Sequence, residues 1–142
     1  VGHQAPQVLF KEEAMANTKA YQFIQEGMVV ACHDVSMGGV FGAISEMLLG
    51  WKGDVSVGCQ LTFQDEQAML QGLFSENGGY VLAVEKEHMS RVVSELEKES
   101  VSVAHVGCTQ SDLNLECVVS NHRVLTLSLQ HMVESWRVLS KA

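Results

Sequence analysis

The sequence predicts an α+β fold in which helices pack on a mixed, largely antiparallel sheet. Short apolar runs with strand character alternate with stretches whose apolar residues recur at helical spacing, which indicates crossovers between strands. Close to the C-terminus, two alternating apolar and polar runs flank the turn Ser120-Asn121-His122, a pattern typical of an antiparallel hairpin. These observations predict the element order α-β-α-β-(α)-β-α-β-β-β-α.

The first elements follow from the apolar spacing at the start of the chain. Residues 1–9 have no clear period and are expected to form a leading segment before a single domain over residues 10–142. A helix is predicted from Glu12 to Glu26, with Gly27 as its stop, because its apolar residues recur at helical spacing. The continuous apolar run from Met28 to Cys32 suits a strand that is buried on both faces.

The middle of the chain continues this alternation. One apolar stripe over residues 40–48 predicts a helix that ends at Gly50. The elements expected after it are a strand over Val55–Leu61, a short helix that begins near Asp65, a buried strand over Gly79–Val84, a helix over residues 89–96 and a strand over Val101–Gly107.

The last elements are the hairpin and a helix. The hairpin strands, Leu113–Val119 and Leu125–Leu129, are expected to have one covered face. Ser128 is a candidate N-cap for the final helix. Trp136 is expected to anchor that helix in the core.

The charge and hydropathy of the chain exclude two classes of partner. The net charge is −8, and only nine Lys and Arg are scattered over 142 residues. The chain therefore lacks the clustered basic face that nucleic-acid phosphates require. Its longest apolar runs are far too short to span a bilayer, and no signal-peptide pattern is visible. We expect neither a nucleic-acid nor a membrane partner, and a cytoplasmic location.

The four cysteines, Cys32, Cys59, Cys108 and Cys117, contain no C-x-x-C pair. Reduced core cysteines in a cytosolic protein are the favoured interpretation, and a disulfide framework is the alternative. A zinc site is expected least, because no pairing of Cys with His matches a known ligand spacing.

The stretch "CHDVSMGG" carries the first candidate site. His33, Asp34 and Ser36 follow a predicted strand, where open α/β sheets place ligand chemistry. Gly38 and Gly39 would let a ligand approach the backbone at a helix start, which favours anions. The alternative is simple capping, in which Asp34 or Ser36 binds the first helical N–H groups. Spacing alone favours capping.

The stretch "GLFSENGGY" carries the second candidate site. Ser75 and Glu76 precede a glycine pair that leads into a predicted strand. A carboxylate there could coordinate Mg²⁺ or bind a substrate hydroxyl. The alternative is a polar turn with Asn77-Gly78 at its tip.

The order of these motifs resembles one family. "HDVSMGGVFGAISEML" is similar to the H-D-x-S-D-G-G-L stretch of the formylglycinamidine ribonucleotide amidotransferases, also called phosphoribosylformylglycinamidine synthases. "GWKGDVSV", Leu73-Phe74-Ser75-Glu76 and "VAHVGCTQ" resemble the motifs that follow in that family. The resemblance implies the C-terminal domain of the aminoimidazole ribonucleotide synthetase-like superfamily.

The resemblance also implies a function. Enzymes of this family use ATP and Mg²⁺ to activate the formyl amide oxygen of formylglycinamide ribonucleotide, and glutamine-derived ammonia then displaces the phosphate in a step of purine synthesis. By resemblance, the partners are an N-terminal nucleotide-binding domain of the same enzyme and a glutaminase domain or subunit. The start at Val1 suggests a fragment, which we expect to lack synthase activity alone and to be able to dimerise.

By resemblance, the substrate phosphate is bound by His33, Asp34, Ser36, Gly38 and Gly39, with Ser75 and Glu76 as second choices. Asp34 and Glu76 are then the candidate Mg²⁺ ligands.

One residue departs from the family's pattern. Met37 stands where the family has Asp before the glycine pair, so a carboxylate is missing from the loop. Either the chain is a divergent branch of the family, or the domain lies in the half of the enzyme whose pseudo-symmetric site is structural. Two rival functions also stay open. One is another ATP-dependent phosphoryl-transfer member of the superfamily, similar to selenophosphate synthetase. The other is a non-catalytic domain that binds nucleotide or mediates assembly.

Overall fold

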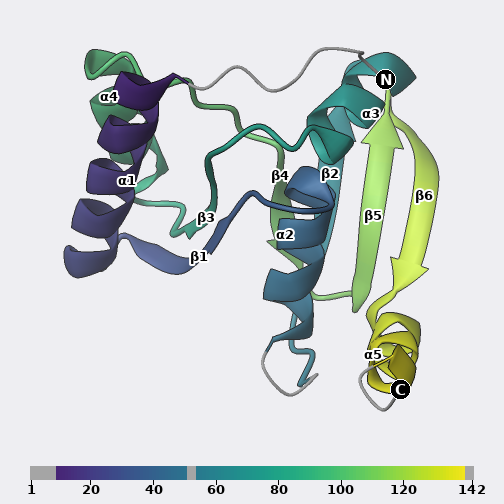
Figure 1. The fold of residues 1–142 in the computed structure, drawn as a ribbon. Helices are drawn as coiled ribbons and strands as arrows, with labels where there is room; N and C mark the ends of the chain where they lie inside the picture. Colours follow the sequence, from purple (N-terminus) through teal and green to yellow (C-terminus); the bar gives the residue numbers. More distant parts are fainter. Residues whose placement is uncertain (1–8, 51–53, 140–142) are drawn as a thin grey trace. The chain divides into compact units, whose positions relative to one another are not determined.

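A computed structural model describes residues 9–50 and 54–139, and its elements follow the predicted order. They are α1 (Phe10–Gln25), β1 (Val29–Asp34), α2 (Gly39–Leu49), β2 (Gly58–Phe63), α3 (Glu66–Phe74), β3 (Tyr80–Val84), α4 (Met89–Lys98), β4 (Gly107–Gln110), β5 (Asn114–Val119), β6 (His122–Ser128) and α5 (Leu129–Leu139) (Figure 1). The predicted leading segment lies almost entirely outside the described residues.

The chain divides into two compact units. Unit 1 comprises the chain up to Ile44 together with Phe74–Ala104, and unit 2 comprises Ser45–Leu73 together with the chain from His105 onward. Each unit has its own sheet. The two-stranded sheet of unit 1 pairs β1 with β3, and the four-stranded sheet of unit 2 has the order β4-β2-β5-β6.

Unit 1 is an antiparallel ribbon that α1 and α4 cover on one side (Figure 1). The spacing of Val92 and Leu96, four residues apart on α4, places both on one face of that helix. Together with Phe23 and Met28 they form a buried cluster, against which Leu82 of β3 packs. This cluster is the core on which the ribbon rests.

The end of α1 follows the prediction. Gly27 adopts a φ of +71°, and its N–H donates to the carbonyl of Ile24, while the N–H of Met28 donates to the carbonyl of Phe23. These two bonds form a Schellman motif, in which glycine is favoured because it has no Cβ. The motif turns the chain from α1 directly into β1.

The ribbon differs from the prediction of strands buried on both faces. The side chain of Val30 is 63% exposed, and Tyr80 at the start of β3 is 38% exposed. The reason is that α1 and α4 cover only one face of a two-stranded ribbon. β1 also continues past Cys32, so that His33 and Asp34 belong to the strand.

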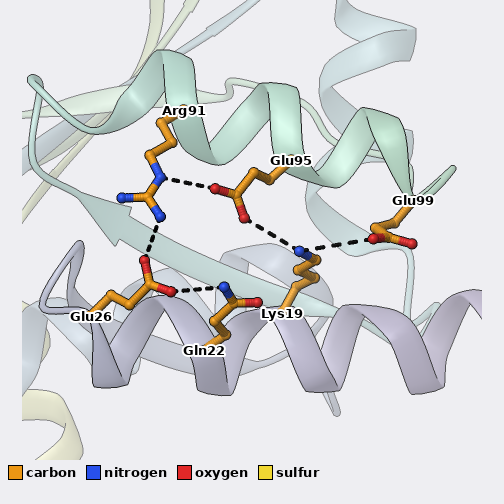
Figure 2. Close-up of polar contacts among 6 residues, drawn as sticks. All are labelled: Lys19, Gln22, Glu26, Arg91, Glu95 and Glu99. Atoms are coloured by element: carbon orange, nitrogen blue, oxygen red, sulfur yellow. Dashed lines mark hydrogen bonds and ion pairs between the residues drawn. The ribbon is translucent and has the colours of Figure 1, made fainter.

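Polar side chains join α1 to α4 beside this core (Figure 2). Arg91 donates from Nη2 to Glu26 Oε2 at 2.6 Å and from Nε to Glu95 Oε1 at 2.9 Å. Lys19 Nζ lies 3.3 Å from Glu95 Oε2 and 4.0 Å from Glu99 Oε1. Glu95 therefore stands between two cations, one from each helix.

This arrangement predicts a dependence of stability on pH. The pKa of Glu95 lies below its ordinary value of 4.5, mainly because Arg91 donates a hydrogen bond to its carboxylate. A lowered folded-state pKa contributes stability above the ordinary value, and that contribution is lost as the pH falls through the lowered pKa. We expect Glu95→Gln to flatten the acid side of a plot of melting temperature against pH. Glu97→Gln on the same helix is the control, and equal profiles for the two variants would contradict the assignment.

Unit 2 contains the mixed, largely antiparallel sheet that the sequence predicts. β2 pairs antiparallel with β4 and parallel with β5, and β5 pairs antiparallel with β6. The hairpin turn is the predicted one: Ser120 and Asn121 have φ values of +48° and +66°, as a two-residue type I′ turn requires. Leu115 and Cys117 are fully buried on the central strand.

Three predictions for this part of the chain were wrong. Residues 101–106 form no strand, because Val101 is buried in the cluster of unit 1 and the N–H of Ser102 donates to Glu12 Oε1 at 2.7 Å. The strand predicted over Val55–Leu61 instead spans Gly58–Phe63. Trp136 is 45% exposed, and the buried residues of α5 are Leu129 and Val133.

The cysteines are all free. Cys59 and Cys117 are buried, as a core interpretation requires, whereas Cys108 on the edge strand β4 is exposed. Burial is the main cause that raises the pKa of the Cys59 thiol to about 11. A thiol with such a pKa stays protonated and unreactive near neutral pH.

Candidate functional site

The first candidate motif lies at the end of β1, opposite the start of β3. Asp34 pairs with Tyr80 in the antiparallel ribbon, and the N–H of Val35 donates to the carbonyl of Gly79 at 2.9 Å. The chain then turns into α2 at Gly39. Because β3 is preceded by the second candidate motif, the ribbon places the two motifs at the same end of unit 1.

A hydrogen bond joins the two motifs directly. The backbone N–H of Gly38 donates to Glu76 Oε1 at 2.9 Å, across 38 positions of sequence. Gly38 and Gly39 have φ values of +86° and +64°, which favour glycine. The carboxylate of Glu76 therefore lies at the N-terminal end of α2, where the helix dipole stabilises negative charge.

Apolar contact supports the same junction. The rings of Phe41 on α2 and Phe74 at the end of α3 lie with their centroids 5.5 Å apart, tilted by 42°. Phe74 immediately precedes Ser75 and Glu76. The aromatic pair thus packs the chain next to the Glu76 carboxylate, and aromatic pairs at such distances are typically worth about 1 kcal/mol beyond the area they bury.

The capping alternative for "CHDVSMGG" is not what the structure has. Within residues 9–50 and 54–139, neither the carboxylate of Asp34 nor the hydroxyl of Ser36 accepts a hydrogen bond from a backbone N–H of α2. The N–H of Gly39 donates to the backbone carbonyl of Ser36 at 3.0 Å. The side chain of Asp34 is 67% exposed. Both Asp34 and Ser36 are exposed.

His33 lies against Asp34. Its Nδ1 is 2.8 Å from the carbonyl oxygen of Asp34 and 3.6 Å from Asp34 Oδ1. A carbonyl oxygen only accepts, so Nδ1 carries the proton in this contact. The ring is thereby held beside the carboxylate, and His33 and Asp34 form one polar pair at the strand end.

The donor set around the loop fits a divalent cation only in part. Among the described residues, no three His, Cys, Asp or Glu side chains converge on a common point. Mg²⁺ is commonly held by one or two carboxylates, with phosphates and water completing its shell. Asp34 and Glu76 could supply such oxygens beside a bound phosphate. Met37 is 88% exposed but has no side-chain oxygen to offer.

Sequence reasoning missed Gly42, which shapes the loop. A Cβ on Gly42 would lie 2.9 Å from the carbonyl oxygen of Met37, closer than real Cβ contacts allow. The N–H of Gly42 donates to the carbonyl of Gly38 as the first helical bond of α2. The third glycine in "GGVFG" was the signal for this close approach.

Comparison with known proteins identifies the family. Residues 3–120 match the family model described as "AIR synthase related protein, C-terminal domain", and the chain belongs to that family. Over 135 residues it is 26% identical to the phosphoribosylformylglycinamidine synthase subunit PurL of Thermoanaerobacter sp. strain X514, covering 94% of this chain and 18% of the relative. The resemblance seen in the sequence is thereby confirmed.

Other relatives differ in kind. The "Probable membrane antigen 75" of Saimiriine herpesvirus 2 is 29% identical over 113 residues, covering 80% of this chain and 8% of that protein. Among solved structures, T. maritima PurL complexed with FGAR matches with a TM-score of 0.70 at 22% identity, covering 85% of this chain and 21% of that one. This likeness confirms the fold. The chain spans less than a fifth of the length of the PurL relative.

Parts of the chain lie outside the family match or outside the described residues. β6 and α5 follow residue 120, where the family match ends. The segment "GWKGDVSV" lies partly in residues 51–53, outside the described residues. None of the helices in the described part of the chain is long and apolar enough to cross a membrane.

Proposed function

We propose that the chain is the C-terminal domain of a phosphoribosylformylglycinamidine synthase and contributes one side of its ATP and substrate site. In that role the whole enzyme uses ATP to phosphorylate the formyl amide oxygen of formylglycinamide ribonucleotide. Ammonia from glutamine then displaces the phosphate and leaves the amidine. An N-terminal domain and a glutaminase domain or subunit supply the remaining machinery, so this chain alone is expected to be inactive.

The observation that carries the proposal is the hydrogen bond between Gly38 and Glu76. It brings together the two motifs by which the sequence resembles the family, at one end of unit 1. The names of two structural neighbours support the ligand class, since they describe T. maritima PurL complexed with ATP and with FGAR.

The residues have distinct roles in this proposal. Glu76 holds the N–H of Gly38 and thereby shapes the loop, and its other oxygen, with Asp34, would face Mg²⁺. The metal would neutralise phosphate charge when bound. Ser36 would donate a hydrogen bond to a phosphate oxygen, and His33 would do so from Nε2 when both of its ring nitrogens carry a proton. Gly38 and Gly39 would let the phosphate approach the start of α2. Ser75 completes the wall next to Glu76.

The test is a set of carboxylate substitutions in the whole enzyme. We expect Asp34→Ala and Glu76→Ala each to lower kcat/KM by about 10- to 100-fold, since each removes a charged contact to the bound metal or phosphate. Glu87→Ala is the matched control, because its carboxylate is 80% exposed in the same unit. Wild-type kcat and KM in both site variants would refute the site.

A second function has a specific observation in its favour. Met37 replaces the carboxylate of the family's motif, and two relatives are herpesvirus proteins whose names describe an antigen and a tegument protein. A non-catalytic domain for nucleotide binding or assembly would fit both facts. Calorimetric titration with formylglycinamide ribonucleotide separates the two functions, because a non-catalytic domain, even one that binds nucleotide, is expected not to bind this substrate.

A further inference from the structure

The candidate loop is attached to α1 through residues that neither motif contains. Tyr80, the first residue of β3, donates from its hydroxyl to Asn17 Oδ1 at 3.2 Å. One turn earlier on α1, the carboxylate of Glu13 lies beside Gly78, where a Cβ would be 3.4 Å from Glu13 Oε1. Asn17 and Glu13 are four residues apart, so they lie on the same face of α1.

The segment that these contacts hold carries Glu76 and pairs with the strand end that carries Asp34. Tyr80 pairs with Asp34 across the ribbon, and Gly79 accepts a hydrogen bond from Val35. Glu76 lies two residues before Gly78 and binds the N–H of Gly38. Any shift of the start of β3 therefore moves Glu76 and Asp34 together.

This segment needs an anchor outside itself. Gly78 and Gly79 are adjacent, and Gly79 has a φ of +143°, a conformation that L side chains rarely adopt. Two consecutive glycines leave the backbone with wide conformational freedom. A hydrogen bond from the rigid helix α1 to Tyr80 restricts that freedom immediately after the glycine pair.

The pair contributes little to global stability. Asn17 is exposed, and Tyr80 is 38% exposed, so their hydrogen bond competes with water and its net contribution is small. The buried cluster of unit 1 and the charged pairs between α1 and α4 already hold the helices in place. The effect of the pair is therefore local, at the turn that carries Glu76.

We infer that Asn17 and Tyr80 are positioning residues for the candidate site. Their hydrogen bond fixes the start of β3, and through it the Glu76 carboxylate that binds Gly38. This inference rests on the proposed function only for the ligand. The geometry that it assigns to the loop is independent of which phosphate compound binds.

The experiment uses the whole protein that contains this chain and has two readouts. Tyr80→Phe and Asn17→Leu remove the donor and the acceptor, and Asn17→Asp keeps an acceptor for the Tyr80 hydroxyl. Amide hydrogen exchange of a peptide covering residues 36–42 reports the Gly38–Glu76 bond, and steady-state kinetics report the KM for formylglycinamide ribonucleotide. Thr18→Val is the control, because the Thr18 hydroxyl donates to the carbonyl of Ala14 on its own helix.

We expect Tyr80→Phe and Asn17→Leu to speed exchange in that peptide and to raise KM, each by about 3- to 10-fold, the factor that one hydrogen bond is worth. The melting temperature and kcat of these two variants should stay close to wild type. Asn17→Asp should keep the exchange rate and KM of the wild-type protein, because it keeps the acceptor. Unchanged exchange in both variants, or a uniform rise across all peptides, overturns the inference. If the two variants exchange faster but the wild-type protein has no synthase activity, the proposed function is contradicted and the inference about the loop stands.

Discussion

Replacing Gly58 with Ala is expected to destabilise unit 2 by at least about 3 kcal/mol, at the upper end of what overpacking usually costs. A Cβ on Gly58 would overlap the carbonyl oxygens of Asp112, in the turn between β4 and β5, and of Asn114, the first residue of β5. These are backbone atoms, so the clash cannot be relieved by the rotation of a side chain. The N–H of Asn114 also donates to the carbonyl of Asp112 at 2.7 Å, which keeps this turn tight.

Gly107→Ala is expected to act in the same way from the other strand. A Cβ there would overlap the carbonyl oxygen of Gln60 and lie 2.9 Å from the Cα of Leu61. The matched control is Gly72→Ala in the same unit, where the Cβ would meet only the ring of Phe63, at 3.4 Å. Because Gly72 lies within α3, alanine should be neutral or slightly stabilising there.

Urea unfolding of the three variants measures these differences. A fall in the midpoint for Gly58→Ala and Gly107→Ala, with no fall for Gly72→Ala, is the expected result. A Gly58→Ala variant as stable as wild type would mean that the turn over residues 111–113 does not cross β2 as closely as described.

The same glycines explain why the strand boundaries of unit 2 escaped prediction. Residues 55–61 and 101–107 both contain apolar residues at strand-like spacing, so their periodicity supported strands in the wrong places. Each true strand begins at its glycine, because only glycine permits the close approach of a neighbouring backbone. That neighbour is distant in sequence and leaves no local signal.

The order of the elements was predictable because it depends on local spacing. The Gly27 stop and the Ser120-Asn121 turn have backbone conformations that their own residues favour, and both were confirmed. The absence of a strand over residues 101–106 was not predictable, because the N–H of Ser102 donates to Glu12, which lies 90 positions away in the sequence.

In the candidate site, too, local features were predictable from the sequence and contacts between distant residues were not. Motif order indicated that residues 33–39 and 75–76 belong together, and the hydrogen bond from Gly38 to Glu76 joins them. The sequence favoured Asp34 or Ser36 as caps of α2, because N-caps are normally local. A carboxylate from another motif stands at that helix start instead. Its partner could be found only from the fold.

Removing Arg123 is expected to cause the second large loss of stability, because it would leave a buried carboxylate without its cationic partner. Glu116 on the central strand β5 has a side chain that is only 4% exposed. Its Oε1 lies 3.3 Å from Arg123 Nη1, and its Oε2 accepts a hydrogen bond from Gln60 Nε2 at 3.4 Å. Without the arginine, a single long hydrogen bond would remain for a carboxylate removed from water.

The size of the effect follows from the asymmetry of the pair. Breaking a fully buried pair typically costs 3–5 kcal/mol, but Arg123 is 59% exposed and its charge is largely solvated. We therefore expect Arg123→Ala to lower the free energy of unfolding by about 2 kcal/mol. Lys86→Ala, which removes an exposed cation from the turn before α4, is the control and should change stability by less than about 0.5 kcal/mol.

A second substitution separates the buried charge from the lost packing of the arginine stem. Glu116→Gln in the Arg123→Ala background removes the charge and keeps an oxygen that can accept from Gln60. If the uncompensated carboxylate causes the loss, the double variant should regain at least half of it in urea unfolding. A double variant as unstable as Arg123→Ala would instead assign the loss to the packing of the aliphatic part of Arg123 on the edge strand β6.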